Sequence, residues 1–154
     1  MVKDNKVLGK NTEIPNSPIG FKFDLIKNRN RKFIFNVRLT ITEFTSICPV
    51  TTQPDFGILF IDYVPKSSLV ESKSLKTYIH SYRNYGIFHE DVVIKIGTDI
   101  FNSIRPIWFR IAGYFAPRGG IPIDVFWQSG KKPINVVIPE LSNFDRKIFN
   151  RKII

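Results

Sequence analysis

The chain has 154 residues, with 23 Lys plus Arg against 13 Asp plus Glu, and therefore carries a formal net charge of +10. A hydrophobic content of 43%, with aromatic residues at 14%, is enough for a packed core and excludes an intrinsically disordered chain or a low-complexity tract. Because no apolar run could span a bilayer and no signal peptide follows Met1, we expect one cytoplasmic domain over residues 1–154.

The N-terminal part is predicted to contain an arm and two strands. Residues 1–30 show no sustained periodicity, and their prolines favour an irregular arm. Hydrophobic and polar residues alternate over 33–41, which predicts a half-buried strand. Residues 48–55 contain two prolines and no period, so we expect a loop, followed by a second strand over 57–64. A loop held by a strand at each end is a common place for chemistry.

Two amphipathic helices are predicted in the middle of the chain. Ser68 and Glu71 have the spacing of a capping box, and apolar residues at helical spacing behind them predict a helix that ends near Asn84. A second apolar stripe, over 92–100, predicts another helix, which stops before Arg105-Pro106. Because only a short break joins the two helices, we expect them to pack antiparallel.

Two further strands, over 107–115 and 121–127, flank a turn at 116–120 and predict a hairpin. The order strand, strand, helix, helix, strand, strand predicts an α+β architecture, a four-stranded antiparallel sheet with the helix pair on one face. Such a sheet leaves unpaired edges on its outer strands. Self-association would cover them.

The basic residues are concentrated at the two ends of the chain. Residues 1–40 carry 9 basic and 3 acidic side chains, residues 41–143 carry 10 and 9, and residues 144–154 carry 4 and 1. A nucleic-acid-binding face would be expected to carry positive charge across the folded domain, interleaved with aromatic residues. We therefore expect a solvated basic tail over 144–154 and no direct nucleic acid binding. An RNA-binding module that uses the terminal basic residues stays an alternative.

Several familiar catalytic motifs are absent from the sequence. It has no G-x-G-x-x-G after a strand, no P-loop and no H-E-x-x-H. One cysteine and two histidines do not supply the ligands of a zinc site within one subunit, so we expect no metal. The remaining candidates are Cys48 in the Pro- and Thr-rich loop, Asp55 seven residues later, the run over 71–76, and His89-Glu90.

Taken singly, each candidate also has an ordinary structural explanation. A lone cysteine such as Cys48 is often a small buried hydrophobe, and Asp55 before a strand could form a turn. Lysines in the run over 71–76 could be a solvated helix face. Glu90 could favour a helix N-terminus, and His89 could be a structural histidine.

The candidates together resemble one enzyme family. The matching segments are EFTSICPVTTQPDFG at 43–57, ESKSLKTY at 71–78, FHE at 88–90 and PRGG at 117–120. This pattern is similar to the short form of NADPH-dependent 7-cyano-7-deazaguanine reductases, the nitrile reductases of queuosine biosynthesis. The resemblance runs from about residue 30 to residue 128, and the terminal arms carry no motif.

The resemblance implies a tunnelling fold (T-fold), the architecture of GTP cyclohydrolase I, in which sheets from several subunits join into an oligomeric barrel with helix pairs outside. It also implies a homo-oligomer of two stacked pentamers with active sites between subunits. Another purine or pterin enzyme of this fold, without redox chemistry, is the main alternative. Such an enzyme would not need Cys48 together with Asp55.

The resemblance also implies a role for each candidate residue. Cys48 would attack the nitrile of 7-cyano-7-deazaguanine as a thiolate to form a thioimide, and Asp55 would be the proton donor. NADPH would then reduce the thioimide, and a second NADPH the resulting imine. The substrate would be bound by Val70, Glu71, Ser72, His89 and Glu90, the last by a bidentate contact to the base. The phosphates of NADPH would be bound by Lys73, Lys76 and Arg118.

Overall fold

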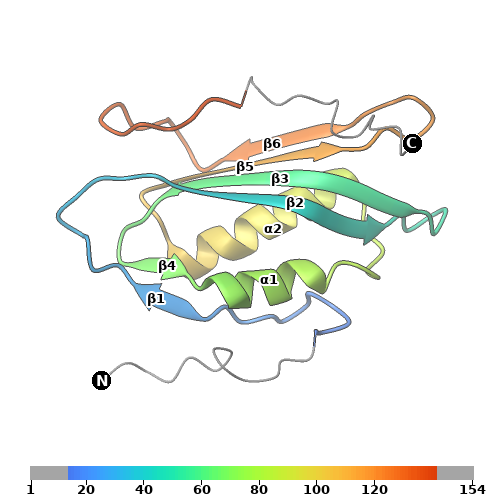
Figure 1. The fold of residues 1–154 in the computed structure, drawn as a ribbon, viewed down its shortest axis with the longest axis horizontal. Helices are drawn as coiled ribbons and strands as arrows, with labels where there is room; N and C mark the ends of the chain where they lie inside the picture. The colour runs from blue at the N-terminus through green and yellow to red at the C-terminus, as the bar shows by residue number, and fades with distance from the viewer. Residues whose placement is uncertain (1–13, 142–154) are drawn as a thin grey trace, which may run out of the picture.

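The structure, a computed structural model, describes residues 14–141 of the chain. A four-stranded sheet carries two helices on one face, and a small two-stranded sheet lies beside the helices (Figure 1). This confirms the predicted α+β architecture. In chain order the elements are β1 (Leu25–Lys27), β2 (Val37–Ile47), β3 (Pro54–Val64), β4 (Ser68–Val70), α1 (Ser72–His80), α2 (His89–Ile104), β5 (Trp108–Phe115) and β6 (Asp124–Gln128).

The main sheet has the strand order β2-β3-β5-β6, and every neighbouring pair is antiparallel. The pairing of β2 with β3 shifts between Ile41 and Phe44, where two residues of β2 face one residue of β3. Such a bulge bends the strand and increases its twist. Pairing then continues to Ile47 and Pro54, so the loop that starts at Cys48 emerges directly from the end of a hydrogen-bonded ladder.

The two helices run in opposite directions across the same face of the sheet, as expected (Figure 1). They are joined by a partly buried hydrogen bond from the Tyr78 hydroxyl to Asp99 Oδ2, at 2.6 Å. The core lies between this helix layer and the sheet. It includes alternate residues of the central strand β3, namely Leu59, Ile61 and Tyr63, as period-two alternation requires.

The start of α1 differs from the prediction. Ser68 does not cap the helix, because Ser68–Val70 form β4 and pair with β1. Glu71 is the N-cap instead, and its carboxylate accepts hydrogen bonds from the N–H groups of Lys73 and Ser74, at 3.0 and 2.7 Å. The helix ends at His80 rather than near Asn84, since the Ser81 N–H is shared between two carbonyls in a tightened last turn.

The strand boundaries also differ. β2 begins at Val37, four residues after the predicted start, and continues to Ile47. β3 begins at Pro54, so Asp55 lies in a strand and not in the preceding loop. Alternation over 33–36 continues the pattern of β2, but this segment has no ladder partner in the described structure. The prolines at 49 and 54 suggested a longer loop, yet Pro54 occupies the first position of its strand, where a missing N–H is tolerated.

The N-terminal arm differs in part from the prediction, and the hairpin of β5 and β6 agrees with it. The irregular arm predicted over 1–30 contains one short strand, β1, which pairs with β4. The predicted hairpin of β5 and β6 is present, with a connection over 116–123. Residues 1–13 and the predicted basic tail at 144–154 lie outside the described residues. Within residues 14–141, no helix has the length and apolar character needed to cross a membrane.

Candidate active site

Cys48 opens a tight loop between β2 and β3. Its N–H donates to the Gln53 carbonyl at 2.9 Å, and its own carbonyl accepts from the Thr52 N–H at 3.0 Å. Thr52 has a φ of 57°, in the left-handed region. This conformation costs a β-branched residue about 1–2 kcal/mol. The surrounding hydrogen bonds therefore hold the loop in one strained shape.

The Cys48 thiol is poised to ionise. The Thr51 hydroxyl, the N–H groups of Thr51 and Val50, and the Arg118 guanidinium donate to the sulfur and lower its pKa from the usual 9.0 to about 6. At neutral pH the thiolate therefore dominates, which is the nucleophilic form of cysteine. The side chain is otherwise covered, and the residue is 4% exposed.

Asp55, the second residue of β3, is buried and lies near this thiol, because Arg118 contacts both side chains. Nitrogen atoms of His89 and Arg118 approach its carboxylate. His89 Nε2 is 3.1 Å from Asp55 Oδ1, and Arg118 Nε is 3.0 Å from the same oxygen. Among residues 14–141, neither carboxylate oxygen has a hydrogen-bond partner, so these two contacts are ion-pair contacts. The buried carboxylate therefore keeps unused hydrogen-bonding capacity.

His89 is positioned by both the helix and the sheet. It is the first residue of α2, it is buried, and its ring stacks on Phe115 with centroids 3.9 Å apart and planes within 9°. The segment before the helix is tied to the end of β2, because Ile47 donates to the Tyr85 carbonyl and accepts from the Ile87 N–H. This link places the start of α2 next to the Cys48 loop. The adjacent Glu90 is exposed to solvent.

Arg118 reaches the site from the tip of the β5–β6 hairpin. Arg118 and Ile121 are joined by two backbone hydrogen bonds, and Gly119 and Gly120 between them have φ values of 58° and 82°. Both positions of this tight turn require positive φ, which glycine adopts without strain. The side chain turns back to Asp55 and also lies 3.5 Å from His89 Nε2. The sequence prediction assigned this residue to phosphate binding and did not place it on Asp55.

The structure divides the predicted site residues into two sets. Cys48, Asp55, His89, Glu90 and Arg118 gather at the end of the sheet where β2 ends. The other set lies at the end of β4 and on α1, and Figure 1 shows that α1 begins beside β4, away from the end of β2. This set is Val70, Glu71, Ser72, Lys73 and Lys76. Within one chain, therefore, the structure does not bring the second set to the thiol.

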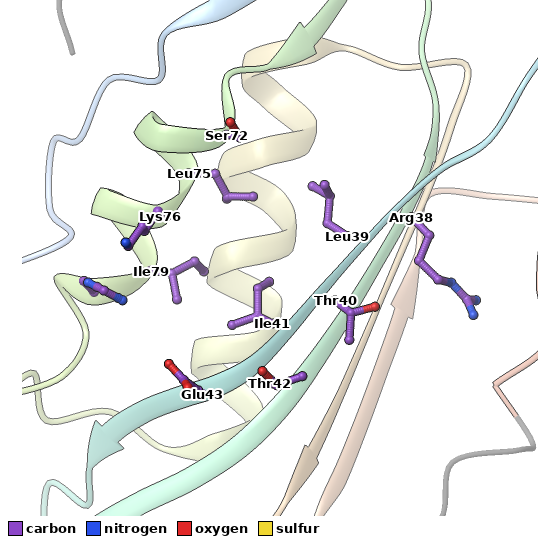
Figure 2. Close-up of a pocket in the computed structure, with 11 residues that line it drawn as sticks. Arg38, Leu39, Thr40, Ile41, Thr42, Glu43, Ser72, Leu75, Lys76 and Ile79 are labelled. Carbon is purple, nitrogen blue, oxygen red and sulfur yellow. The ribbon is translucent and has the colours of Figure 1, made fainter. Parts of the chain in front are cut away.

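Two members of the second set, Ser72 and Lys76, line a groove between β2 and α1 with a volume of about 410 Å³. Figure 2 shows the apolar side chains of its floor pointing toward one another from the two elements: Leu39, Ile41, Leu75 and Ile79. Its polar margin includes Glu43, Ser72, Lys76 and His80. Burial, with the charges of Arg83 and Lys76, lowers the pKa of His80.

Glu71 has a structural task that the sequence did not reveal. Burial alone would raise the pKa of its carboxyl, but hydrogen bonds from the Lys73 and Ser74 N–H groups bring the pKa below its usual value. The carboxylate is therefore committed to capping α1 in this structure.

Among residues 14–141, no three His, Cys, Asp or Glu side chains are grouped as metal ligands.

Three residues of the Cys48 site were missed in the sequence. Thr51 donates to the sulfur, Phe115 stacks on His89, and Ser46 is buried with an unpaired hydroxyl beside Asp55. Period-two alternation could have placed Ser46 on the same face of β2 as Cys48. No local signal marked Phe115, because its contact depends on how α2 meets the sheet.

Comparison with known proteins identifies close relatives. Residues 54–134 match the family described as QueF-like protein. The chain is 52% identical over 139 residues to a protein of Parvibaculum lavamentivorans named NADPH-dependent 7-cyano-7-deazaguanine reductase, covering 90% of each chain. It is 51% identical over 140 residues to a protein of Bradyrhizobium diazoefficiens with the same name, covering 91% of this chain and 92% of the relative.

A solved structure has the same fold. It is the apo form of an archaeosine synthase described as QueF-Like, with a TM-score of 0.58 and 22% sequence identity. The match covers 64% of this chain and 96% of that one. The predicted α+β fold is therefore found in a solved relative of low sequence identity.

Proposed function

The chain belongs to the QueF-like protein family, and from this membership we propose that it reduces the nitrile of 7-cyano-7-deazaguanine to an aminomethyl group, with NADPH, in queuosine biosynthesis. The observation that carries the proposal to a chemical mechanism is the Cys48 thiolate beside Asp55 in one buried site. Queuosine is a modified nucleoside of tRNA, so the proposal places the enzyme in the cytoplasm.

The first step is the formation of a covalent bond between Cys48 and the substrate. The thiolate attacks the nitrile carbon, one π bond of the nitrile breaks, and the nitrogen takes a proton from Asp55. The product is a neutral thioimide, and Asp55 is left as a carboxylate. His89 and Arg118 lie on Asp55 Oδ1 and would stabilise that carboxylate.

Bound NADPH supplies a hydride in each of two reductions. The first hydride, added to the thioimide carbon, would expel Cys48 as a thiolate and leave an imine. The second hydride, together with one proton taken up from solvent, would convert that imine to the amine. A thiol with a pKa of about 6 is a good leaving group as well as a nucleophile, so one residue serves both steps. Burial of the site limits access of water to the reactive intermediates.

The positive charges of three residues match the negative phosphates of a cofactor such as NADPH. Lys76 borders the groove between β2 and α1, Lys73 lies one turn earlier on the same helix, and Arg118 lies at the thiol. These cations are suited to the phosphates of NADPH, including its 2′-phosphate. Because the lysines lie on α1 and no contact joins them to the thiol in the described part of one chain, we infer that each site is completed by a neighbouring subunit.

The same inference applies to base recognition. Glu90, exposed beside His89, would accept from the ring N–H and the amino group of the base. The segment Val70-Glu71-Ser72 of a neighbouring subunit would close the base pocket, with Glu71 keeping its cap. The strand order leaves β2 and β6 as edges, and pairing them between subunits would build a barrel of two stacked pentamers.

The decisive experiment is an absorbance assay of NADPH with 7-cyano-7-deazaguanine, run with the parent protein and with Cys48→Ala. We expect the parent to consume about two NADPH per nitrile, because each hydride transfer takes one, and the variant to consume none. Mass spectrometry of the parent with the nitrile alone should show an adduct on Cys48. A parent that binds the base but leaves NADPH unchanged would contradict the proposal and favour a purine or pterin enzyme without redox chemistry.

A further inference from the structure

The Ser46 hydroxyl is buried, and no contact within the fold explains a polar group at this position. The residue is 0% exposed, and among residues 14–141 its Oγ has no hydrogen-bond partner. Native proteins satisfy most buried polar side chains, so an unsatisfied one calls for an explanation. An alanine at this position would fill the same space in the strand without that cost.

The residue opposite Ser46 is Asp55. The two are paired in the ladder between β2 and β3, so their side chains project from the same face of the sheet. Cβ atoms of directly opposed residues lie about 4.5–5.5 Å apart, which allows a serine hydroxyl to reach a carboxylate by rotation about one bond. Both residues are buried, and Cys48 follows Ser46 by two positions on the same strand face.

The other groups around Asp55 leave its oxygens available to Ser46. The contacts of His89, from α2, and of Arg118, from the β5–β6 hairpin, are ion-pair contacts to Oδ1, at 3.1 and 3.0 Å. In the described part of the chain, neither Oδ1 nor Oδ2 has a hydrogen-bond partner. The remaining charged groups nearby are the Cys48 thiolate and Glu90, which interact with Arg118. Neither can donate a hydrogen bond to a carboxylate.

The thiolate is not the partner of Ser46. Among residues 14–141 the Ser46 Oγ has no hydrogen-bond partner, so it does not donate to the Cys48 sulfur. The backbone groups of the next residue, Ile47, are already paired with Tyr85 and Ile87. The Asp55 carboxylate is therefore the acceptor that the geometry offers.

We propose that Ser46 is a positioning residue for the proton donor, and that its hydroxyl donates to Asp55 Oδ2 as the carboxyl group gives up its proton. The inference rests on the proposed function, in which Asp55 protonates the nitrile nitrogen. The hydroxyl keeps its own hydrogen throughout, and only the Asp55 proton is transferred. Together with the contacts on Oδ1, this bond holds both oxygens of the newly formed carboxylate.

The test compares Ser46→Ala with Thr45→Ala, a matched loss on the other face of β2, where Thr45 pairs with Phe56. We expect Ser46→Ala to lower kcat about tenfold, as for loss of a hydrogen bond to a charged group, with less than about a twofold change in the KM of the nitrile. Its thermal midpoint should equal or exceed that of the parent, because an unsatisfied hydroxyl is removed. Thr45→Ala should keep the parent kcat.

The split between kcat and KM separates a positioning role from a structural one. A serine that only supports the fold would, when replaced, lower the thermal midpoint and change kcat and the KM of the nitrile together. A fall in kcat at an unchanged KM, with an unchanged or higher thermal midpoint, assigns the effect to the proton-transfer step. A lowered thermal midpoint with kcat and KM both impaired would assign Ser46 a structural role and overturn the inference.

The outcomes also separate this inference from the proposed function. If the parent consumes no NADPH with the nitrile, the proposed function fails, and the role of Ser46 in it fails too. If the parent turns over normally and Ser46→Ala matches Thr45→Ala in kcat, the inference about Ser46 alone is overturned.

Discussion

At the scale of single residues, the reactivity of Cys48 depends on its own loop. The Thr51 hydroxyl, the Thr51 N–H and the Val50 N–H belong to residues that follow the cysteine within three positions. Of the groups that lower the pKa, Arg118 is the one that comes from another element. The strained Thr52 conformation fixes where these donors point. The loop therefore carries most of the information for making a thiolate.

Replacing Thr51 by valine should weaken this activation. The change removes the first of the causes that lower the Cys48 pKa and keeps the side-chain volume, so the pKa should rise from about 6 toward 9.0. The thiolate is then lost at a higher pH as the solution is acidified. The rate of alkylation by iodoacetamide at pH 6 should fall about fivefold, in line with the loss of one hydrogen bond to a charged group.

The control for this change is Thr98→Val, because Thr98 donates to the Ile94 carbonyl within α2 and does not touch the loop. Its alkylation profile should match that of the parent. A Thr51→Val protein whose rate also follows the parent profile from pH 5 to pH 9 would show that the Thr51 hydroxyl does not act on the sulfur.

At the scale of elements, the close approach of α2 to β5 positions His89. Both elements contribute a glycine to the contact. A Cβ on Gly113 would lie 2.5 Å from Val93 Cγ2, and a Cβ on Gly97 would lie 2.8 Å from Ile111 Cγ2. The helix can therefore lie closer to the strand than larger residues would permit. His89 is the first residue of α2, so the separation between α2 and β5 determines how closely His89 approaches Asp55.

Gly113→Ala should accordingly destabilise the protein by about 1–3 kcal/mol, the usual cost of overpacking a core. Urea denaturation measures this loss. Gly86→Ala is a matched control, since its added Cβ would make only an ordinary contact with Pro49 Cα, at 3.5 Å. Equal midpoints for the two variants would show that α2 can move away from β5 without cost.

Most of the elements could be predicted from periodicity. The second helix, the hairpin and the antiparallel layer order were correct, because long apolar stripes and glycine-rich turns are local signals. The first helix start was wrong, since pairing of β1 with β4 over a long sequence separation turned Ser68–Val70 into a strand. From the sequence alone, Ser68 and Glu71 are both suitable N-caps for α1. The strand that decides between them, β1, lies far away in the sequence.

The site was predicted by motif, and only part of its geometry follows from the sequence. The proximity of Cys48 and Asp55 follows from two strands joined by a short loop. The ion pair between Arg118 and Asp55 could not be predicted, because it depends on how the hairpin tip folds over the sheet end. The roles of these residues in catalysis stay predictions, as do the lysine contacts with the cofactor.

At the scale of the whole molecule, residues 136–139 cover part of the sheet face away from the helices, where Ile138 packs on Val64 and Trp108. Asp62, in the middle of β3, is buried and paired with Arg38 at 2.8 Å and Arg110 at 2.7 Å. Both arginines also donate to the Pro139 carbonyl, at 2.7 and 2.8 Å. One carboxylate thus orders two side chains that fasten residue 139 across three strands.

Asp62→Asn should loosen this cover. Burial alone would raise the pKa of Asp62, but hydrogen bonds from Arg38, Arg110 and Asn36 hold it below its usual 3.8. The stability from this pairing is present above pH 3.8 and is lost as the pH falls through the lower pKa of the folded state. We expect Asp62→Asn to lose about 1–3 kcal/mol at pH 7, discounted because both arginines keep some exposure.

Thermal melts between pH 7 and pH 2 measure both effects. The difference between parent and Asp62→Asn should shrink as the solution is acidified below pH 3.8, since protonation removes the charge that the substitution removes. A difference that stays constant over this range would mean that the asparagine is tolerated or rejected for its shape and not for its charge.

Each chain places its thiol where β2 ends and its two lysines on α1. If neighbouring chains complete each site as proposed, every chain in a closed ring contributes cations to one neighbour and receives them from the next, so complete sites are as numerous as chains. A separated chain would then have no complete site. Dilution would stop catalysis while leaving each subunit folded.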